Sequence, residues 1–421
     1  MNREARDKRP NLRPVEKIEL SEKNLLVRLI LVLVLITVAG VAIYFGVNGL
    51  LAGNAGWTEI DASSSSQTNC SDEFVFQYEV GTGEKSASVE KKALIQIYSQ
   101  ATETAYQLFQ ESARFDDVHN VAYINQHPNE EIEVDPVLYA AFEKLEKAGN
   151  RYLYLGTLYE YYDSIFRCDD LSQTVEYDPV NNEEIQGLYR DIVAYGSNPE
   201  MIDLELLGEN RVMLKVAKEY LDFCREEELH SFIHFYWMKN AFITDYLADT
   251  IAEKGFTKGI ISSDDGYTRN LDTRGVQEYS MNLFDRVDTN IYGAGVMRYQ
   301  APVSMVVYRD FPVNKSDGTK YVGINKDRIL SRYISFETGQ CKAAVPLLVC
   351  YTDSQSCADV MLATADCFLT DSLTEENLAT MKSLGIQYVY GQDYVIHYSD
   401  DSLKISDLYE KDGICYTSTK E

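Results

Sequence analysis

The segment from 358 to 370, ADVMLATADCFLT, places two carboxylates and two hydroxyls among small residues. Carboxylate and hydroxyl oxygens are the kind of ligand that Mg²⁺ takes in proteins. Asp366 and Thr370 are four residues apart, so on a helix their side chains would share one face and could hold a hard cation. Asp359 and Thr364 are five apart and would need a helix irregularity to converge. Spacing alone equally suits an Asp that caps a helix and a Thr that packs in it.

His230 and His234 form a second candidate for metal binding. On a helix their spacing in HSFIH would place both imidazoles on one face. A zinc protease needs Glu directly after the first histidine, and Ser231 stands there instead. Because no third ligand is evident, the pattern favours ordinary histidines over a metal site.

A third candidate is SSDDGYTRN, residues 262–270, where Asp264 and Asp265 are adjacent. A metal or phosphate loop would use such residues, but Asp and Gly are also the ordinary residues of turns. We therefore expect a turn here.

The stretch RYISFETG, residues 332–339, lies between a basic segment and an apolar run, where a catalytic loop could lie. Arg332, its first residue, cannot accept a proton near neutral pH, although its guanidinium could bind a phosphate.

Helices and strands are predicted in a mixed order, which favours an α+β fold. Residues from about 73 to 421 contain no further low-complexity break, which favours one large continuous domain after the N-terminal region. Strands are predicted at 74–80, 301–311 and 343–352; helices are predicted at 88–113, 134–148, about 212–229, 240–255 and 374–384.

The charge is strongly acidic. Of 421 residues, 39 are Lys or Arg and 66 are Asp or Glu, giving a formal net charge of −27. Residues 1–28 carry eight basic and five acidic residues, so the remainder holds 31 basic and 61 acidic residues. Such a surface repels phosphate backbones, which excludes nucleic acid as a partner.

Residues 29–47 contain no charged side chain and are long enough for a helix that spans a bilayer. Basic residues precede this run, so we expect residues 1–28 in the cytoplasm and the bulk of the chain outside. A cleaved signal peptide is the competing interpretation, but its apolar region would be shorter. The expected order is an anchor at 29–47, a flexible linker at 48–72 and an extracytoplasmic domain at 73–421.

All eight cysteines follow the predicted anchor, where disulfides are permitted, and their even number suggests pairing. No C-x-x-C motif occurs, so neither a zinc ribbon nor a thioredoxin-type site is indicated. The sequence does not choose among the possible connectivities. The cysteines are 70, 168, 224, 341, 350, 357, 367 and 415.

Taken in order, the segments from about 74 onward resemble the ApbE-type FAD:protein FMN transferases. FDDVHNVAYIN (115–125) is similar to the family's fS…S.l..lN loop, and VDPVLYAAFEKL to the helix that follows it. These enzymes are extracytoplasmic, split FAD with Mg²⁺ and attach FMN to Ser or Thr of a target protein. The resemblance thus implies an ApbE-like single large ectodomain behind one transmembrane helix.

Two family motifs are altered around the expected cofactor site. FYWMKNAFITD (235–245) stands where the family has G-G-I-A-K-G-Y-A-x-D, with aromatic residues in the region of the glycines. The family Lys corresponds to Lys239 or Asn240, and Asp245 matches. GIISSDDG (259–266) likewise lacks the glycines of the family's Gly-Gly-Asn.

Two further motifs are altered around the expected metal and catalytic positions. In RYISFETG, Arg332 occupies the family His position, while Thr338 and Gly339 are retained. ADVMLATA (358–365) has one residue too many between Asp359 and Thr364, which would supply metal ligands in the family.

We infer from these changes a degenerate member that acts as a flavin- or protein-binding module. In this interpretation Lys239, Asp245, Thr338 and Gly339 are the candidate cofactor-binding residues. The alternative is a divergent, active FAD:protein FMN transferase that uses Asp359, Thr364, Asp366 and Thr370 for Mg²⁺ and modifies a surface redox protein. A third possibility is an acidic surface protein with no connection to flavin.

Overall fold

The computed structural model describes residues 53–63, 67–167, 176–288, 290–325, 328–411 and 413–421. The predicted cytoplasmic segment 1–28, the predicted anchor 29–47 and Cys168 lie outside these residues. None of the helices in the described ranges is long and apolar enough to cross a membrane.

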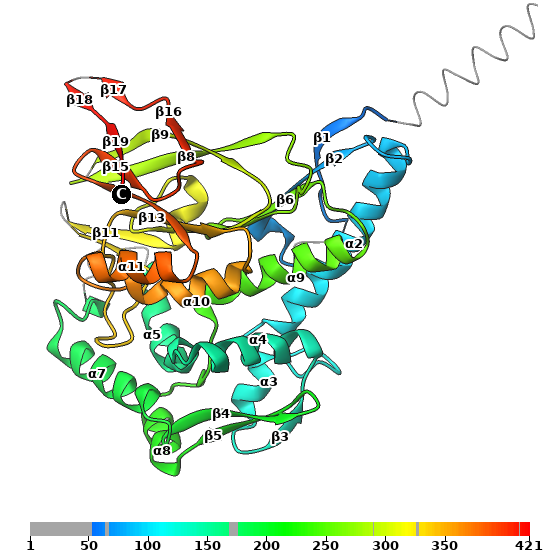
Figure 1. Cartoon of the computed structure of the whole chain (residues 1–421). Coiled ribbons are helices and arrows are strands. Elements are labelled where there is room, and N and C mark those ends of the chain that lie inside the picture. The colour runs from blue at the N-terminus through cyan, green and yellow to red at the C-terminus, as the bar shows by residue number, and fades with distance from the viewer. Residues whose placement is uncertain (1–52, 64–66, 168–175, 289, 326–327, 412) are drawn as a thin grey trace, which may run out of the picture. The chain divides into compact units, whose positions relative to one another are not determined.

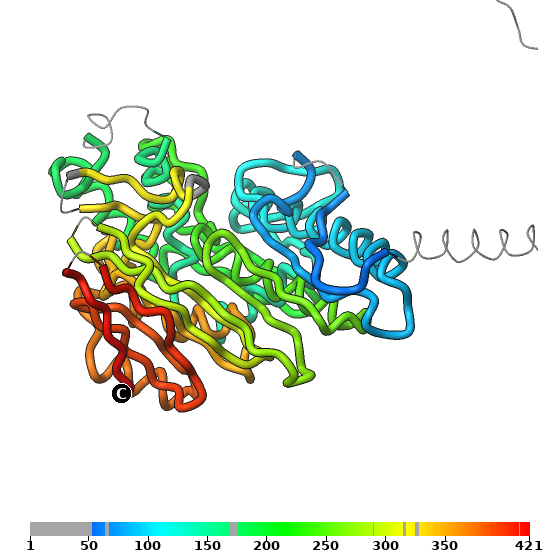
Figure 2. Tube along the Cα trace, turned by 90° about the horizontal axis from the view of Figure 1, so that it is seen from above, coloured from blue at the N-terminus to red at the C-terminus, as the bar shows by residue number. Residues whose placement is uncertain are grey.

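A nine-stranded sheet forms the centre of the folded unit, and its first and last strands in the chain lie at opposite edges (Figure 2). Neighbouring strands are antiparallel, except that β15 and β19 are parallel. In spatial order the strands are β1 (Gly56–Glu59), β2 (Phe74–Val80), β6 (Gly259–Ser263), β7 (Tyr267–Asn270), β10 (Val303–Arg309), β13 (Leu347–Thr352), β14 (Gln387–Gln392), β15 (Val395–Tyr398) and β19 (Thr417–Lys420).

Helices α9, α10 and α11 lie along one face of this sheet, and the hairpin of β8 and β9 lies on the other (Figure 1). Because both faces are covered, every residue of β13 is buried. The helices are α2 (Ala87–Leu108), α3 (Val121–Gln126), α4 (Pro136–Ala148), α5 (Gly156–Arg167), α7 (Glu183–Ser197), α8 (Lys218–Glu226), α9 (Lys239–Glu253), α10 (Cys357–Phe368) and α11 (Glu375–Ser383).

Smaller sheets complete the α+β fold. They comprise β3 (Glu131–Glu133), β5 (Arg211–Val216) and β4 (Ile202–Gly208); β16 (Lys404–Ser406), β9 (Asn290–Gln300) and β8 (Glu278–Val287); β11 (Tyr321–Asn325) with β12 (Arg328–Ser331); and β17 (Glu410–Lys411) with β18 (Ile414–Cys415).

Capping residues begin or end several helices where the sequence predicted. The Asp135 side chain accepts the Val137 N–H and Pro136 begins α4. Gly255, just after α9, has a positive φ of 85°, which suits glycine at a helix end. The α+β prediction is confirmed.

Three predictions differ from the structure. Residues 212–216, expected in a helix that runs to about 229, belong to β5 (Arg211–Val216), and only Lys218–Glu226 are helical. Residues 56–59, expected in a linker, form β1 and pair with β2. The seven cysteines among the described residues are all unpaired thiols, so the expected disulfides do not form between them. Most of these thiols are buried in the core, where Cys behaves as a small apolar residue.

Candidate functional site

A polar cleft of about 390 Å³ opens where the end of α2, α5, the segment before α9 and the residue after β12 meet. It brings together Arg332 and Lys239, two positions that the sequence singled out. Five carboxylates and three Lys or Arg side chains line this cleft. The lining, called the polar cleft below, is Glu73, Gln110, Glu111, Ser112, Tyr159, Glu160, Asp163, Arg167, Ser231, His234, Tyr236, Lys239, Asp265 and Arg332.

Tyr236 and Tyr159 form an aromatic stack on one wall. Their ring centroids are 4.5 Å apart with an interplanar angle of 17°. Tyr236 is 7% exposed and has φ +47°, a left-handed conformation that a bulky residue adopts only at a cost. The chain here has the backbone conformation of a glycine but carries a large ring.

Arg332 lies over this stack, with its guanidinium carbon 5.4 Å from the centroid of the Tyr236 ring. Its nearest charged partner is Asp163, at 3.7 Å, too far for a hydrogen bond. Nε is buried without a partner among the described residues. Burial opposes its charge, but Tyr236 and Asp163 raise the pKa of Arg332, so it is a permanent cation. The side chain is 29% exposed, and a guanidinium without a carboxylate within hydrogen-bond distance is suited to bind an anion.

Lys239, at the start of α9, is the second cation of the cleft. Its Nζ is 3.4 Å from Glu73 Oε1. Burial would lower the pKa of Lys239, but Glu73, Glu111 and Asp265 together outweigh burial and raise it. The lysine is therefore charged beside a group of carboxylates.

His234, which the sequence singled out only as a possible metal ligand, also faces the polar cleft. Its Nδ1 is 3.0 Å from Glu111 Oε1, and the two side chains are 19% and 13% exposed. His230 and His234 do not share a helix, because residues 229–235 precede α9 as a loop. His230 is 78% exposed and lies 3.3 Å from Glu160. The Glu111–His234 contact joins residues far apart in the chain, so no local pattern could reveal it.

Asp265 lines the cleft through its place in the turn between β6 and β7. It accepts a hydrogen bond from Asn240 Nδ2 at 2.7 Å and lies 2.6 Å from Lys320 Nζ. Gly266 has φ +96°, and a Cβ there would lie 2.5 Å from the Val307 carbonyl oxygen. The predicted turn is confirmed, and its glycine is required.

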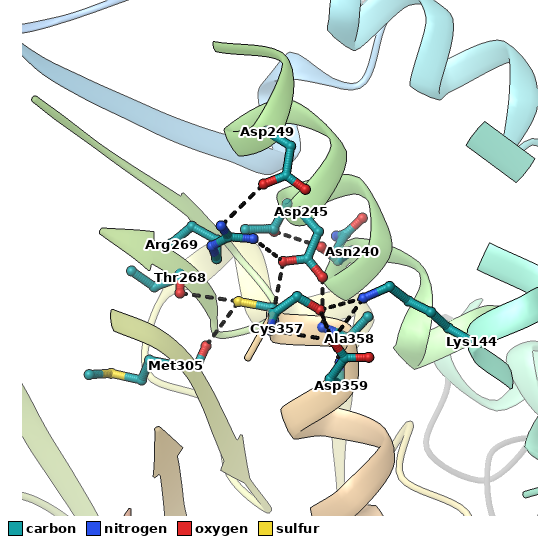
Figure 3. Close-up of polar contacts among 12 residues, drawn as sticks. Lys144, Asn240, Asp245, Asp249, Thr268, Arg269, Met305, Cys357, Ala358 and Asp359 are labelled. Atoms are coloured by element: carbon teal, nitrogen blue, oxygen red, sulfur yellow. Dashed lines mark hydrogen bonds and ion pairs between the residues drawn. The ribbon is translucent and has the colours of Figure 1, made fainter. Parts of the chain in front are cut away.

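Asp245 is not in the cleft but at the N-terminus of α10, as Figure 3 shows. Its carboxylate accepts the N–H groups of Cys357 and Ala358, both at 2.9 Å, and pairs with Arg269 at 2.8 Å. A carboxylate at a helix N-terminus is favoured by the helix dipole. Asp245 therefore joins α9, α10 and β7.

Three of the four predicted metal ligands have separate partners. Asp359 forms a capping box with Ser356 and lies 2.9 Å from Lys144 Nζ. Thr364 donates to the Val360 carbonyl at 2.7 Å and contacts the Tyr308 hydroxyl.

Asp366 accepts a hydrogen bond from the Tyr152 hydroxyl at 2.6 Å. Thr370 lies beyond α10, which ends at Phe368, so the helical spacing expected for Asp366 and Thr370 is absent. Within the described residues, no group of three or more His, Cys, Asp or Glu side chains could hold a metal.

Thr338 and Gly339 form a turn outside the cleft lining. The Gly339 N–H donates to the Ser335 carbonyl at 2.9 Å, and Gly339 has φ +66°. A Cβ at Gly339 would lie 3.0 Å from Val193. Glycine is needed here for packing between the loop and α7.

No protein-family model and no curated protein matches the sequence. Solved structures do match. The ApbE protein of Thermotoga maritima aligns with a TM-score of 0.52 and 11% identity, over 83% of this chain and 97% of its own. The flavin transferase ApbE of Vibrio cholerae aligns with a TM-score of 0.50 and 12% identity, over 84% and 98%. The chain has an ApbE-like fold. At these identities the likeness concerns the fold alone.

The residues of this ApbE-like fold do not fit Mg²⁺ at the predicted positions. Lys144 already neutralises Asp359. The Thr364 hydroxyl donates to the Val360 carbonyl, and the Asp366 carboxylate accepts the Tyr152 hydroxyl. The residues at the positions of the family glycines also do not fit a flavin. There Tyr236 and Trp237 are buried, and the Tyr236 ring is held between Tyr159 and Arg332.

Proposed function

We propose that this protein is a membrane-anchored, extracytoplasmic ApbE-like domain that has lost FMN transfer and acts as a binding module through its polar cleft. The uncharged run at 29–47, preceded by basic residues, supports the anchor and the orientation. The ApbE-like fold supports an origin in flavin chemistry.

One observation carries the loss of transfer: the stack of Arg332, Tyr236 and Tyr159. Glycines at such a loop let backbone N–H groups approach a ligand, because no Cβ intervenes. Here a tyrosine keeps the left-handed backbone and places its ring against Tyr159. Arg332, at the position of the family His, supplies no group that accepts a proton.

The ligand that this cleft suits is small and carries an anionic group. Arg332 has no carboxylate within hydrogen-bond distance, and Lys239 is a second cation in the same lining. The surrounding carboxylates each have a partner, as Asp265 with Lys320 and Glu73 with Lys239 show. The cleft therefore offers cationic groups for a phosphate or carboxylate.

The test is titration of FAD, then FMN, into the full-length protein in detergent micelles, with and without Mg²⁺. We expect no Mg²⁺-dependent binding of FAD and no transfer of FMN to a peptide that contains Ser and Thr. Transfer of FMN to the peptide would overturn the proposal in favour of an active transferase.

A further inference from the structure

Five lysines gather at the end of the domain where the chain enters it. Ala55, directly before β1, packs against Gly81, directly after β2: a Cβ at Gly81 would lie 3.0 Å from the Ala55 Cβ. The Lys91 Nζ donates to the Thr58 hydroxyl of β1 at 3.1 Å. Figure 1 shows β1 and the start of α2 together at this end. The five lysines, called the lysine patch below, are Lys85, Lys91, Lys92, Lys254 and Lys258.

Contacts between distant segments bring the lysine patch together. The Lys258 Nζ donates to the Thr82 hydroxyl at 2.9 Å, which joins the segment after α9 to the loop before α2. The Lys85 Nζ lies 5.8 Å from the centroid of the Phe256 ring, which joins the same two segments. Lys254 precedes this ring by two residues. The start of α2, the end of α9 and β1 therefore share one surface.

The lysine patch is not neutralised by neighbouring carboxylates. None of its five side chains forms an ion pair within the described residues, whereas eight described lysines elsewhere do. In β1 and in the segments that carry the patch, the acidic residues are Glu59, Glu84, Glu90 and Glu253. Glu90 is 7% exposed and the other three are exposed, so three exposed carboxylates accompany five lysines. This end is therefore cationic in a chain whose net charge is −27.

Exposed apolar side chains lie on the same elements. Trp57 of β1 is 38% exposed, and its Nε1 donates to the Gln277 side chain at 3.3 Å. Val89 of α2 is 55% exposed and lies three residues before Lys92, so the two side chains share one helix face. Lysine and tryptophan are residues that favour the headgroup layer of a membrane. The composition of this surface therefore fits a lipid bilayer.

We propose that the lysine patch, with Trp57 and Val89, docks the domain on anionic lipid headgroups of the bilayer that holds the anchor. Nine residues separate Trp57 from Val47, so the anchor keeps Trp57 within roughly 35 Å of that bilayer. Each lysine at an anionic surface favours docking by about fivefold. The inference rests on the proposed function for the anchor.

Docking by this end sets the orientation of the domain. The rest of the surface is acidic and is repelled by the same headgroups. The polar cleft is lined by residues that follow the opposite end of α2, such as Gln110 and Glu111. The cleft therefore stays open to ligands while the lysine patch contacts the bilayer.

The first experiment measures quenching of Trp57 fluorescence in the full-length protein, reconstituted into vesicles whose acyl chains carry bromine. One set of vesicles is phosphatidylcholine alone, and the other contains phosphatidylglycerol. The chain has two tryptophans; Trp237 is 3% exposed, and Trp57→Phe gives its background signal. We expect quenching of Trp57 in the anionic vesicles, and its loss in 1 M salt, which screens charges beyond about 3 Å. Equal quenching in the two kinds of vesicle would overturn the proposal.

The second experiment compares two double variants in the same vesicles. Lys92→Gln with Lys254→Gln removes two exposed lysines of the patch. Lys147→Gln with Lys382→Gln is the matched control, because it removes two exposed lysines that also form no ion pair within the described residues but lie outside the patch. We expect the first pair to lower the ratio of docked to undocked protein by about tenfold or more, and the control to leave it unchanged. An equal loss in both variants would contradict the proposal, because net charge alone would then explain it.

Flotation with vesicles of phosphatidylcholine alone separates the anchor from the docking surface. We expect the full-length protein to float with these neutral vesicles, because the anchor does not depend on anionic lipid. Protein that floats but shows no charge-dependent quenching would overturn the docking and leave the anchor intact. Protein that does not float would overturn the anchor and the docking with it. Because none of these measurements involves flavin, transfer of FMN would overturn the proposed loss of activity and leave the docking result unchanged.

Discussion

Asp245 and Arg269 form a largely buried ion pair, 2.8 Å apart, at the N-terminus of α10. Their side chains are 8% and 18% exposed. Arg269 also reaches Asp249 at 3.2 Å, while the second oxygen of Asp245 binds the Ala358 N–H. The resemblance to ApbE implied a cofactor-binding role for Asp245. Its contacts in this structure instead join two helices and a strand, so its removal should affect stability.

We expect Asp245→Ala to lower the free energy of unfolding by about 3–5 kcal/mol, because it leaves a largely buried arginine with only the exposed carboxylate of Asp249 and leaves two N–H groups uncapped. Chemical denaturation measures this. The control is Arg225→Ala, which breaks an exposed pair with Asp222 and should cause no measurable loss. Equal losses in the two variants would contradict the role given to Asp245.

Asp285 gives a prediction for pH. It is fully buried on β8, and burial raises its pKa from 3.8 to about 6, although the Tyr416 hydroxyl and the Arg286 N–H bind it. Because the folded pKa exceeds the unfolded one, the ionised form destabilises the fold. That cost applies above pH 6, declines as the pH falls through about 6 and has gone below 3.8.

Asp285→Asn should therefore raise the free energy of unfolding near neutral pH by roughly 2–3 kcal/mol, and the gain should vanish near pH 4. Denaturant unfolding across this pH range measures the difference between variant and parent. Asp353→Asn, at an exposed carboxylate, is the control and should follow the parent. A gain that does not depend on pH would show that side-chain shape, not charge, is responsible.

Sequence patterns anticipated the elements whose ends carry local signals. The helices predicted at 134–148 and 374–384 lie close to α4, which Asp135 and Pro136 begin, and to α11, which Gly385 follows. The strand β5 was missed because its apolar residues also fit a helical spacing, and its pairing partner β4 decided the outcome. Tertiary context overrides local propensity in such cases.

For the candidate site, the motif comparison singled out Arg332 and Lys239, and both line the polar cleft. It did not find the Glu111–His234 pair, whose members come from the end of α2 and the loop before α9. Nor could spacing show that Lys144, on α4, would meet Asp359 on α10. Contacts between distant segments depend on how helices pack, which the sequence alone does not specify.

Gly339 tests whether the retained Thr338-Gly339 pair is structural. Gly339→Ala should lower the free energy of unfolding by about 1–2 kcal/mol for a left-handed alanine, and by a further 1–3 kcal/mol for overpacking against Val193. Gly385→Ala is the matched control, because it has φ +71° but open space around it. Thermal or denaturant unfolding of both variants isolates the packing cost. Equal losses of unfolding free energy in the two variants would show that Gly339 is not needed for packing. Thr338 and Gly339 would then again be candidates for cofactor binding.

The pair of Lys144 and Asp359 gives the test for metal. Burial would raise the pKa of Asp359, but Lys144 and Ser356 together lower it, so the pair stabilises the fold above pH 3.8 and loses its effect on acidification. Lys144→Gln should cost only roughly 0.5 kcal/mol, because solvent screens two half-exposed side chains. Lys147→Gln, on the same helix but exposed, is the control. Mg²⁺ or a chelator should leave the melting temperature of the parent and of Lys147→Gln unchanged, because Lys144 already neutralises the carboxylate. Stabilisation by Mg²⁺ that Asp359→Asn abolishes would restore the metal site and the active-transferase interpretation.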